Sequence, residues 1–306
     1  MDIGELTQLS ETMHTRKRPK TRSAYEGAWR RFRRWCAARD FETDDPFVVG
    51  LYLIGRYEAG LSLATLSMDR NAIRYHHDMG IQPSPTEHVI VKNVLAGLRG
   101  RAREDGRPQP RQARGITAER FRRIRETAHK PRKQGSGLES EERARRRAAL
   151  EVALIAVMRD AMLRRGEAVA LRWSDVAFRP DGTAWVVVRE SKTSAEPAVQ
   201  HIRKGAADAV RLIMPEDPDP RARVFGYTTP ASVTKRIKRA CAAAGLGEKG
   251  YSGHSPRVGM AQDLAANGAA LPAVMVAGRW QSPEMPARYA RKLRADRSAV
   301  AALPED

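Results

Sequence analysis

The chain has 306 residues, enough for two domains of ordinary size, and 42% of them are hydrophobic, as in folded rather than disordered proteins. Its 55 lysines and arginines against 36 acidic residues give a formal net charge of +19. That excess indicates a polyanionic partner, either nucleic acid or an anionic membrane surface, and the absence of an apolar run of about 18 residues argues against a membrane span.

The N-terminal segment and the cysteines bear on location. The start MDIGELTQLSE is acidic and polar, unlike a signal peptide. Two cysteines, Cys36 and Cys241, are too few for a disulfide framework or a zinc cluster. These features predict a reduced, cytoplasmic and nucleoid-associated protein.

Residues 1–20 form a basic polar tail, and a small helical domain is predicted over 21–104. In its first helix Tyr25, Trp29 and Phe32 recur every three or four residues, as on the buried face of an amphipathic helix. Asp45, Ser62 and several glycines mark where other helices begin and end. The expected helices are 21–40, 45–60, 62–80 and 87–103.

The composition changes over 105–115, which is rich in glycine, proline and charge and is expected to be an exposed linker. Residues 116–306 then form a second domain, in which 131–147 is predicted to be a mobile charged connection. A β-branched run after an Asp-Gly turn indicates a small antiparallel sheet. The expected strands are 184–189 and 198–202, and the expected helices are 117–129, 148–163 (buried), 204–214, 230–244, 255–267, 271–278 and 283–293. The predicted fold is therefore mainly α.

The stretch SGHSPRVGM places His254 and Arg257 at the start of a predicted helix, with Ser255 as its expected N-cap and Pro256 in its first turn. A helix N-terminus attracts phosphate, and an arginine binds two phosphate oxygens at once. The alternative is a capping histidine beside a surface arginine.

Five further residues have the same ambiguity. Arg164 ends the buried helix with Glu167 one turn later, which fits either a phosphate clamp or a surface ion pair. Lys192 lies at the tip of the predicted hairpin, where it is either a mobile acid or a solvated turn residue. Trp280 and Tyr289 follow, and a tyrosine near a C-terminus is often there for packing alone.

The order of these residues is similar to the catalytic set of the tyrosine recombinases, the phage integrase family. The stretch SGHSPRVGMAQDLAANGAALPAVMVAGRW resembles in particular the Cre-type members, which carry tryptophan where most of the family has histidine. The resemblance covers roughly residues 20–300. It implies an N-terminal four-helix core-binding domain and a mostly helical catalytic domain with a small sheet. Pro286 departs from the family pattern, but within the first turn of a helix it breaks no hydrogen bond.

The resemblance implies a site-specific recombinase that cleaves and rejoins DNA through a 3′-phosphotyrosyl intermediate and a Holliday junction, without metal, ATP or another cofactor. Tyr289 would be the nucleophile, and Arg164 and Arg257 would hold the phosphate. Lys192 would protonate the leaving oxygen. The implied supporting roles belong to His254 as base or phosphate donor, Trp280 as an N–H donor and Glu167 as an orienting carboxylate.

The same resemblance implies a homotetramer on two DNA sites, each a double-stranded site with inverted-repeat arms. A C-terminal helix near Val300–Leu303 would bind a neighbouring protomer, or else fray. The residues expected to contact DNA are Arg22, Ser67, Arg70, Asn71, Lys235, Arg236, Lys238 and Arg239. Three alternatives remain: a type IB topoisomerase-like or hairpin-forming enzyme, a non-enzymatic DNA-binding protein of this fold, and a membrane-surface protein.

Overall fold

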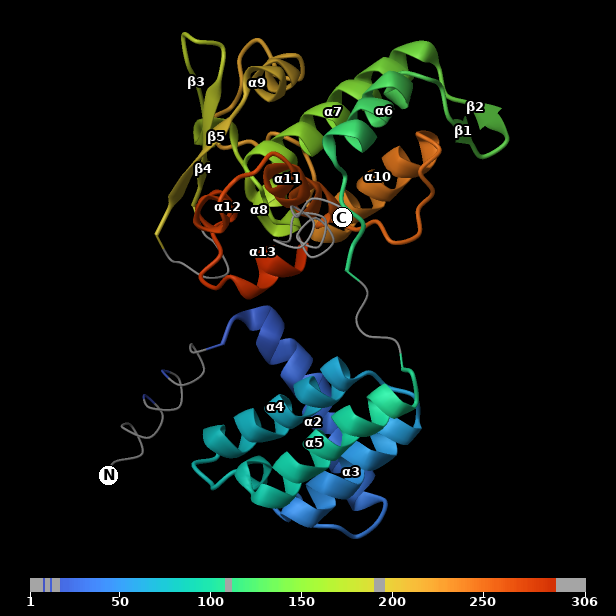
Figure 1. Ribbon diagram of the computed structural model, residues 1–306, viewed down its shortest axis with the longest axis vertical. Coiled ribbons are helices and arrows are strands. Elements are labelled where there is room, and N and C mark those ends of the chain that lie inside the picture. The colour runs from blue at the N-terminus through green and yellow to red at the C-terminus, as the bar shows by residue number, and fades with distance from the viewer. Residues whose placement is uncertain (1–7, 9–11, 13–16, 108–111, 190–195, 290–306) are drawn as a thin grey trace, which may run out of the picture. The chain divides into compact units, whose positions relative to one another are not determined.

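The computed structural model describes residues 8, 12, 17–107, 112–189 and 196–289. The chain divides into two compact units, 1–109 and 110–306, each with its own hydrophobic core. Figure 1 labels the helices and strands of both units. None of the helices in this described part combines the length and apolarity that crossing a bilayer requires.

Unit 1 is a helical domain, as expected. Its helices begin at the caps that the sequence suggests: the Asp45 carboxylate accepts the Phe47 N–H at 2.7 Å, and the Ser62 hydroxyl accepts the Thr65 N–H at 3.2 Å. The described elements are α2 (Pro19–Ala37), α3 (Pro46–Glu58), α4 (Leu63–Met79), the 3₁₀ turn η1 (Pro85–Glu87) and α5 (Val89–Glu104).

The core of unit 1 forms where α2 packs against α4 and α3 packs against α5 (Figure 1). Phe32 and Cys36 of α2 are buried, while Trp29 is partly buried at the edge of the same cluster. The Phe32 and Tyr52 rings are tilted with centroids 5.0 Å apart. The apolar spacing read from the sequence therefore faces the core, and the arginines between these residues face outward.

Unit 2 is mostly helical with a small sheet. The order along the chain alternates helices with two short antiparallel β segments. Its elements are α6 (Ala118–Ala128), β1 (Lys133–Gln134), β2 (Gly137–Leu138), α7 (Glu141–Asp160), α8 (Arg165–Ala170), the 3₁₀ turn η2 (Trp173–Asp175), β3 (Val176–Phe178), β4 (Ala184–Val188), β5 (Ala198–Ile202), α9 (Lys204–Arg211), α10 (Pro230–Ala243), α11 (Ser255–Ala266), α12 (Leu271–Gly278) and α13 (Glu284–Tyr289).

The central helix α7 starts earlier than expected. Residues 131–147, predicted to be a mobile connection, instead hold the β1–β2 hairpin and the first turns of α7. Ser140 caps the helix by accepting the Arg143 N–H. Arg147 donates to the Ala128 carbonyl oxygen at 2.9 Å and to Glu139, so its charge is paired inside the fold. The charged composition was misleading because these arginines have partners within the unit.

The sheet has three strands in the order β3-β4-β5, all antiparallel. Val186 pairs with Val176 on one side and Gln200 on the other. Along β4, Ala184, Val186 and Val188 are buried while Trp185 is 46% exposed, which is the alternation of a sheet covered on one face. The sequence predicted the last two strands but not the short β3.

The structure corrects two expectations, the end of the linker before α6 and the N-cap of α11. The exposed linker was expected to reach residue 115, but Gly115 is buried, and Ile116, directly after it, is fully buried and donates its N–H to the Ser255 carbonyl at 2.8 Å. Ser255 is the first residue of α11 and not its N-cap, which is His254. The Ser255 hydroxyl accepts the Ser252 N–H, so it caps the preceding loop instead.

Candidate active site

The expected catalytic residues lie where α11, α12 and α13 pack together, and a side-chain contact joins α8 to this group (Figure 1). They come from helix ends and loops far apart in the chain. The described members are Arg164 and Glu167 at α8, His254 and Arg257 at α11, Trp280 after α12, and Tyr289 in α13. Lys192 lies outside the described residues, as does the C-terminal segment expected to bind a neighbour.

Arg257 is the buried centre of this cluster, with 3% of its surface exposed. Its Nη1 donates to the Met162 carbonyl oxygen at 2.6 Å, and its Nη2 donates to the Gly278 carbonyl oxygen. Its guanidinium carbon lies 4.3 Å from the centroid of the Trp280 ring. These contacts hold one guanidinium between the end of α7 and the end of α12, which excludes the surface arginine of the alternative reading.

Glu167 forms the anionic part of the cluster. Its Oε1 accepts a hydrogen bond from Arg164 Nη1 at 2.8 Å, and its Oε2 accepts the Arg164 backbone N–H at 2.9 Å. The side chain of Glu167 is 6% exposed and that of Arg164 is 19% exposed, so this is not a solvated surface pair. The carboxylate fixes the direction of the Arg164 guanidinium at the start of α8.

Sequence reasoning missed Arg279. Its Nη2 lies 2.5 Å from Glu167 Oε2, and its side chain is 10% exposed. Arg279 stands directly before Trp280 in the motif AGRWQS, but in a chain rich in arginine that position alone does not distinguish it. Only the tertiary structure reveals the contact, because it brings the C-terminal cap of α12 to Glu167 of α8.

Burial and mutual repulsion set the pKa values of the central groups. Burial, aided by the positive charges of Arg164 and Arg279, lowers the pKa of Arg257 to about 9, which leaves it charged near neutral pH. Burial also raises the pKa of Tyr289 above its usual value, although Arg257 opposes the shift. Tyr289 is therefore a neutral phenol at neutral pH and needs a proton acceptor before it can act as a nucleophile.

The pKa of His254 is shifted by its surroundings. Partial desolvation of its imidazole and the nearby charges of Arg165, Arg257 and Arg164 lower its pKa below the usual value. Its ring makes no helix-capping hydrogen bond, which argues against the simple capping role. Arg165 is a second residue that sequence reasoning missed. Its side chain packs close to Gly253, the residue before His254.

Tyr289 lies against Trp280, with ring centroids 5.7 Å apart and planes inclined by 58°. Both residues pack against a small apolar cluster that includes Met162, Met260 and Val274. Pro286 is the third residue of α13, within the first turn as predicted. Tyr289 is therefore packed against apolar side chains, and it also lies within electrostatic reach of Arg257 and Arg164.

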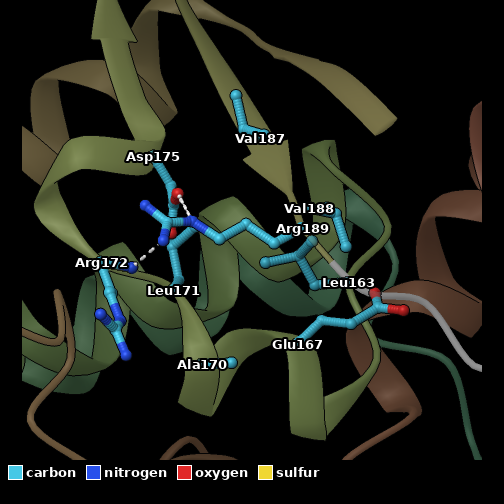
Figure 2. Close-up of a pocket in the computed structure, with 9 residues that line it drawn as sticks. All are labelled: Leu163, Glu167, Ala170, Leu171, Arg172, Asp175, Val187, Val188 and Arg189. Atoms are coloured by element: carbon cyan, nitrogen blue, oxygen red, sulfur yellow. Dashed lines mark hydrogen bonds and ion pairs between the residues drawn. The ribbon is translucent and has the colours of Figure 1, made fainter. Parts of the chain in front are cut away.

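A cavity of 380 Å³ lies behind Glu167, lined also by Arg172, Asp175 and Arg189. Figure 2 shows Arg189 reaching toward Asp175, while the Glu167 carboxylate points away from that pair. Arg189 Nε lies 2.5 Å from Asp175 Oδ1, and its Nη2 donates to the Ser174 hydroxyl at 2.9 Å. The ion pair anchors the end of β4, from which the chain continues toward Lys192.

The expected DNA-contacting residues of α10 do not share one environment. Lys235 and Arg239 are exposed and Lys238 is half-buried. Arg236 instead points inward, and its Nη1 lies 3.2 Å from Glu151, which is fully buried. Arg236 therefore belongs to an internal ion-pair cluster in this structure.

The unit 1 candidates lie on α2 and α4. Asn71 is exposed, and Arg22 and Ser67 are partly exposed. Arg70 lies 2.8 Å from Glu87 of η1, so its charge is already paired in the structure. Among the described residues no group of three or more histidine, cysteine, aspartate or glutamate side chains is arranged to hold a metal ion.

The chain is similar to known proteins over most of its length. A model of the phage integrase family matches residues 116–295. Over 302 residues the chain is 23% identical to recombinase Cre of Escherichia phage P1, covering 89% of this chain and 84% of that protein.

Solved structures of low identity share the fold. The Tn1549 transposon integrase in complex with transposon right end DNA gives a TM-score of 0.62 at 15% identity, covering 97% of this chain and 99% of that one. XerH recombinase bound to a palindromic difH substrate gives a TM-score of 0.58 at 17% identity, and the match covers 84% of this chain and 70% of that one. A lambda integrase dimer bound to a COC′ core site gives a TM-score of 0.57 at 16% identity, and the match covers 98% of this chain and 78% of that one. Because the family match spans more than half of the chain, this protein belongs to the phage integrase family of tyrosine recombinases, enzymes that cleave and rejoin DNA.

Proposed function

We propose that this protein is a Cre-like site-specific recombinase that exchanges DNA strands through a 3′-phosphotyrosyl intermediate and a Holliday junction. The observation that carries the proposal is the position of Tyr289, half-buried against Trp280 and within electrostatic reach of Arg257 and Arg164. A phenol beside two guanidinium groups is suited to attack a phosphodiester whose negative charge those groups hold.

In this mechanism the Tyr289 oxygen attacks the scissile phosphorus and passes its proton to neutral His254. The bond from phosphorus to the 5′ oxygen breaks, and Lys192 supplies the proton to that oxygen. Arg164 and Arg257 bind the non-bridging oxygens and stabilise the charge that develops in the transition state. Religation to the 5′-hydroxyl of another strand reverses these steps.

The remaining roles extend from the same cluster. Trp280 presents its indole N–H to the phosphate and packs the tyrosine helix, and Glu167 orients Arg164. No metal or nucleotide cofactor takes part in the proposed chemistry, because the arginines supply the positive charge. The proposed partners are double-stranded DNA with inverted-repeat arms and three further copies of this chain, forming a tetramer on two sites.

DNA contacts outside the active site are proposed to come from two sets of side chains. On α10 these are Lys235, Lys238 and Arg239, with Arg236 supporting them from inside through Glu151. On unit 1 they are Arg22, Ser67, Arg70 and Asn71. Most of these contacts are expected on phosphates, which position the protein without reading the sequence.

A covalent trap tests the proposal. The protein is incubated with nicked duplexes carrying randomised arms, in EDTA, and denatured; we expect DNA to stay attached to the parent and to Tyr251→Phe but not to Tyr289→Phe. Tyr251 is a matched control because it is a buried tyrosine of the same unit whose hydroxyl has no hydrogen-bond partner in the described structure. The released strand should accept a 5′ label directly from polynucleotide kinase, because it ends in a hydroxyl. Attachment that survives Tyr289→Phe would refute the assignment of the nucleophile.

The alternative outcomes have separate products. Sequencing the trapped DNA identifies the arm, and two duplexes bearing that arm should then yield four-way junctions and recombinants. Relaxation of a supercoiled plasmid without junctions would indicate topoisomerase-like chemistry. Hairpin ends would indicate a hairpin-forming strand transferase.

A further inference from the structure

Arg279 contacts both sides of the connection between α7 and α8, the segment that carries Arg164. Its Nη2 lies 2.5 Å from Glu167 Oε2 in α8, and its Nη1 donates at 3.3 Å to the carbonyl oxygen of Ala161, which follows the end of α7. Arg164 lies between these two anchors. One planar guanidinium therefore spans the junction between α7 and α8, as only a forked donor can do.

The backbone of Arg279 is held in an unfavourable conformation. It is the C-terminal cap of α12 and has φ of 52°, in the left-handed region where glycine is the usual residue. A side chain at this position costs backbone free energy that glycine would avoid. The contacts of the guanidinium must offset that cost, so the side chain does something that an ordinary helix cap does not require.

The contacts divide the Glu167 carboxylate between two arginines. Oε2 accepts from Arg279 Nη2 and also from the Arg164 backbone N–H at 2.9 Å, and Oε1 accepts from Arg164 Nη1 at 2.8 Å. Without Arg279 the carboxylate would lose the contact that ties it to the end of α12 and would be left with its two contacts to Arg164. Arg279 also adds a third guanidinium beside Arg164 and Arg257, of which Glu167 balances one.

We propose that Arg279 is a positioning residue of the active site, which fixes Glu167 and thereby aims the Arg164 guanidinium at the scissile phosphate. The inference rests on the proposed function, in which Arg164 binds that phosphate. Arg279 acts through Glu167 and the α7–α8 corner and does not itself touch the DNA.

The test uses Arg279→Gly, because glycine relieves the left-handed backbone while removing the guanidinium. We expect the single-turnover rate of covalent attachment to fall about 10- to 100-fold, the range typical of residues that orient a reacting group. DNA affinity and the unfolding midpoint should stay near those of the parent. Arg279→Lys should recover part of the rate, since an ammonium group can reach Glu167 but cannot span to Ala161 as well.

Two controls make the result specific. Asp40→Gly relieves a comparable left-handed residue, with φ of 54°, in unit 1 and should leave the rate unchanged. A double-mutant cycle with Glu167→Gln should be non-additive, so that Arg279→Gly costs little once the carboxylate is gone.

The outcomes separate the two proposals. A parental rate in Arg279→Gly, or fully additive losses in the cycle, would overturn the positioning role while leaving the recombinase proposal intact. Failure of the parent to attach to any DNA would overturn both. A rate loss matched by an equal loss of stability, with no recovery in Arg279→Lys, would show that the residue only holds the fold together.

Discussion

The guanidinium of Arg257 lies over the ring of Trp280, 4.3 Å from its centroid, and the Tyr289 ring packs against the same indole with its centroid 5.7 Å away. The indole therefore connects the buried arginine to the tyrosine helix. Cation–π contacts of this kind strengthen when both partners are desolvated, as Arg257 is here. Displacing the ring should disturb the arginine and the tyrosine together.

Gly278→Ala tests that relationship without substituting any of the three residues. A Cβ at Gly278 would clash with the Trp280 ring, so the ring must shift from the position in which it packs on Arg257. We expect unfolding to become easier by about 1–3 kcal/mol, as in overpacked cores, and attachment to slow. Gly97→Ala is the control, because no atom lies within 4 Å of its Cβ position in α5, and this change should stabilise the helix by about 0.5–1 kcal/mol. Equal unfolding midpoints for the two variants would contradict the packing argument.

The proposed base role of His254 predicts the pH dependence of cleavage. Its pKa lies below the usual 6.5, so the imidazole stays neutral at neutral pH and becomes protonated only in more acidic solution. The attachment rate should therefore be level near pH 7 and fall with acid, and His254→Gln should be slow without this acid limb.

Arg165→Gln should move the pH dependence of attachment toward higher pH. Removing this positive charge should raise the pKa of His254, because Arg165 is the main charged group that lowers it. The acid limb should then begin at a higher pH than in the parent. Rates measured from about pH 5 to pH 8 would resolve the difference, and an unmoved profile would exclude His254 as the titrating group.

Glu151 should be a large contributor to the stability of unit 2. It is fully buried and pairs with Arg132 at 2.7 Å, Arg147 at 3.3 Å and Arg236 at 3.2 Å. Glu151→Gln leaves three arginines short of one negative charge, and we expect a loss of about 3 kcal/mol in the free energy of unfolding, measured in urea.

The matched control for that change is Glu142→Gln on the same helix. Glu142 is 75% exposed and pairs with Arg146 one turn away, so its loss should cost only about 0.3–0.5 kcal/mol. If the two variants unfolded at the same urea concentration, the buried cluster would have no special role. DNA binding should also weaken in Glu151→Gln, because Arg236 holds α10 to the cluster.

The two thiols should be unreactive in the native protein. Burial raises the pKa of Cys241 to about 12 and raises that of Cys36 as well, so both side chains remain mainly protonated thiols at pH 8. Iodoacetamide should modify neither residue until the chain is unfolded, and mass spectrometry after labelling would detect both. Rapid modification of the native protein would show that one of the cores opens readily.

Most of the fold was predictable because the signals that start, end and orient a helix are local in the sequence. Asp45 and Ser62 cap α3 and α4, and the spacing of Phe32 and Cys36 gives the buried face of α2. The order of the motif residues from Arg164 to Tyr289 was likewise readable along the chain. Each of these signals lies within a few turns of one element.

The sequence by itself thus determined most of the helices, the family resemblance and the set of candidate residues, but it missed the first turns of α7 and the short helix α8, whose N-cap is Arg164. Only the tertiary structure decided which arginine does what: Arg236 faces the buried Glu151, Arg257 binds the carbonyls of Met162 and Gly278, and Arg279 reaches Glu167. The physical reason is that an arginine carries the same charge and helix propensity wherever it stands. Its partner is chosen by long-range packing, which brings together carboxylates and carbonyl groups that are distant in the chain.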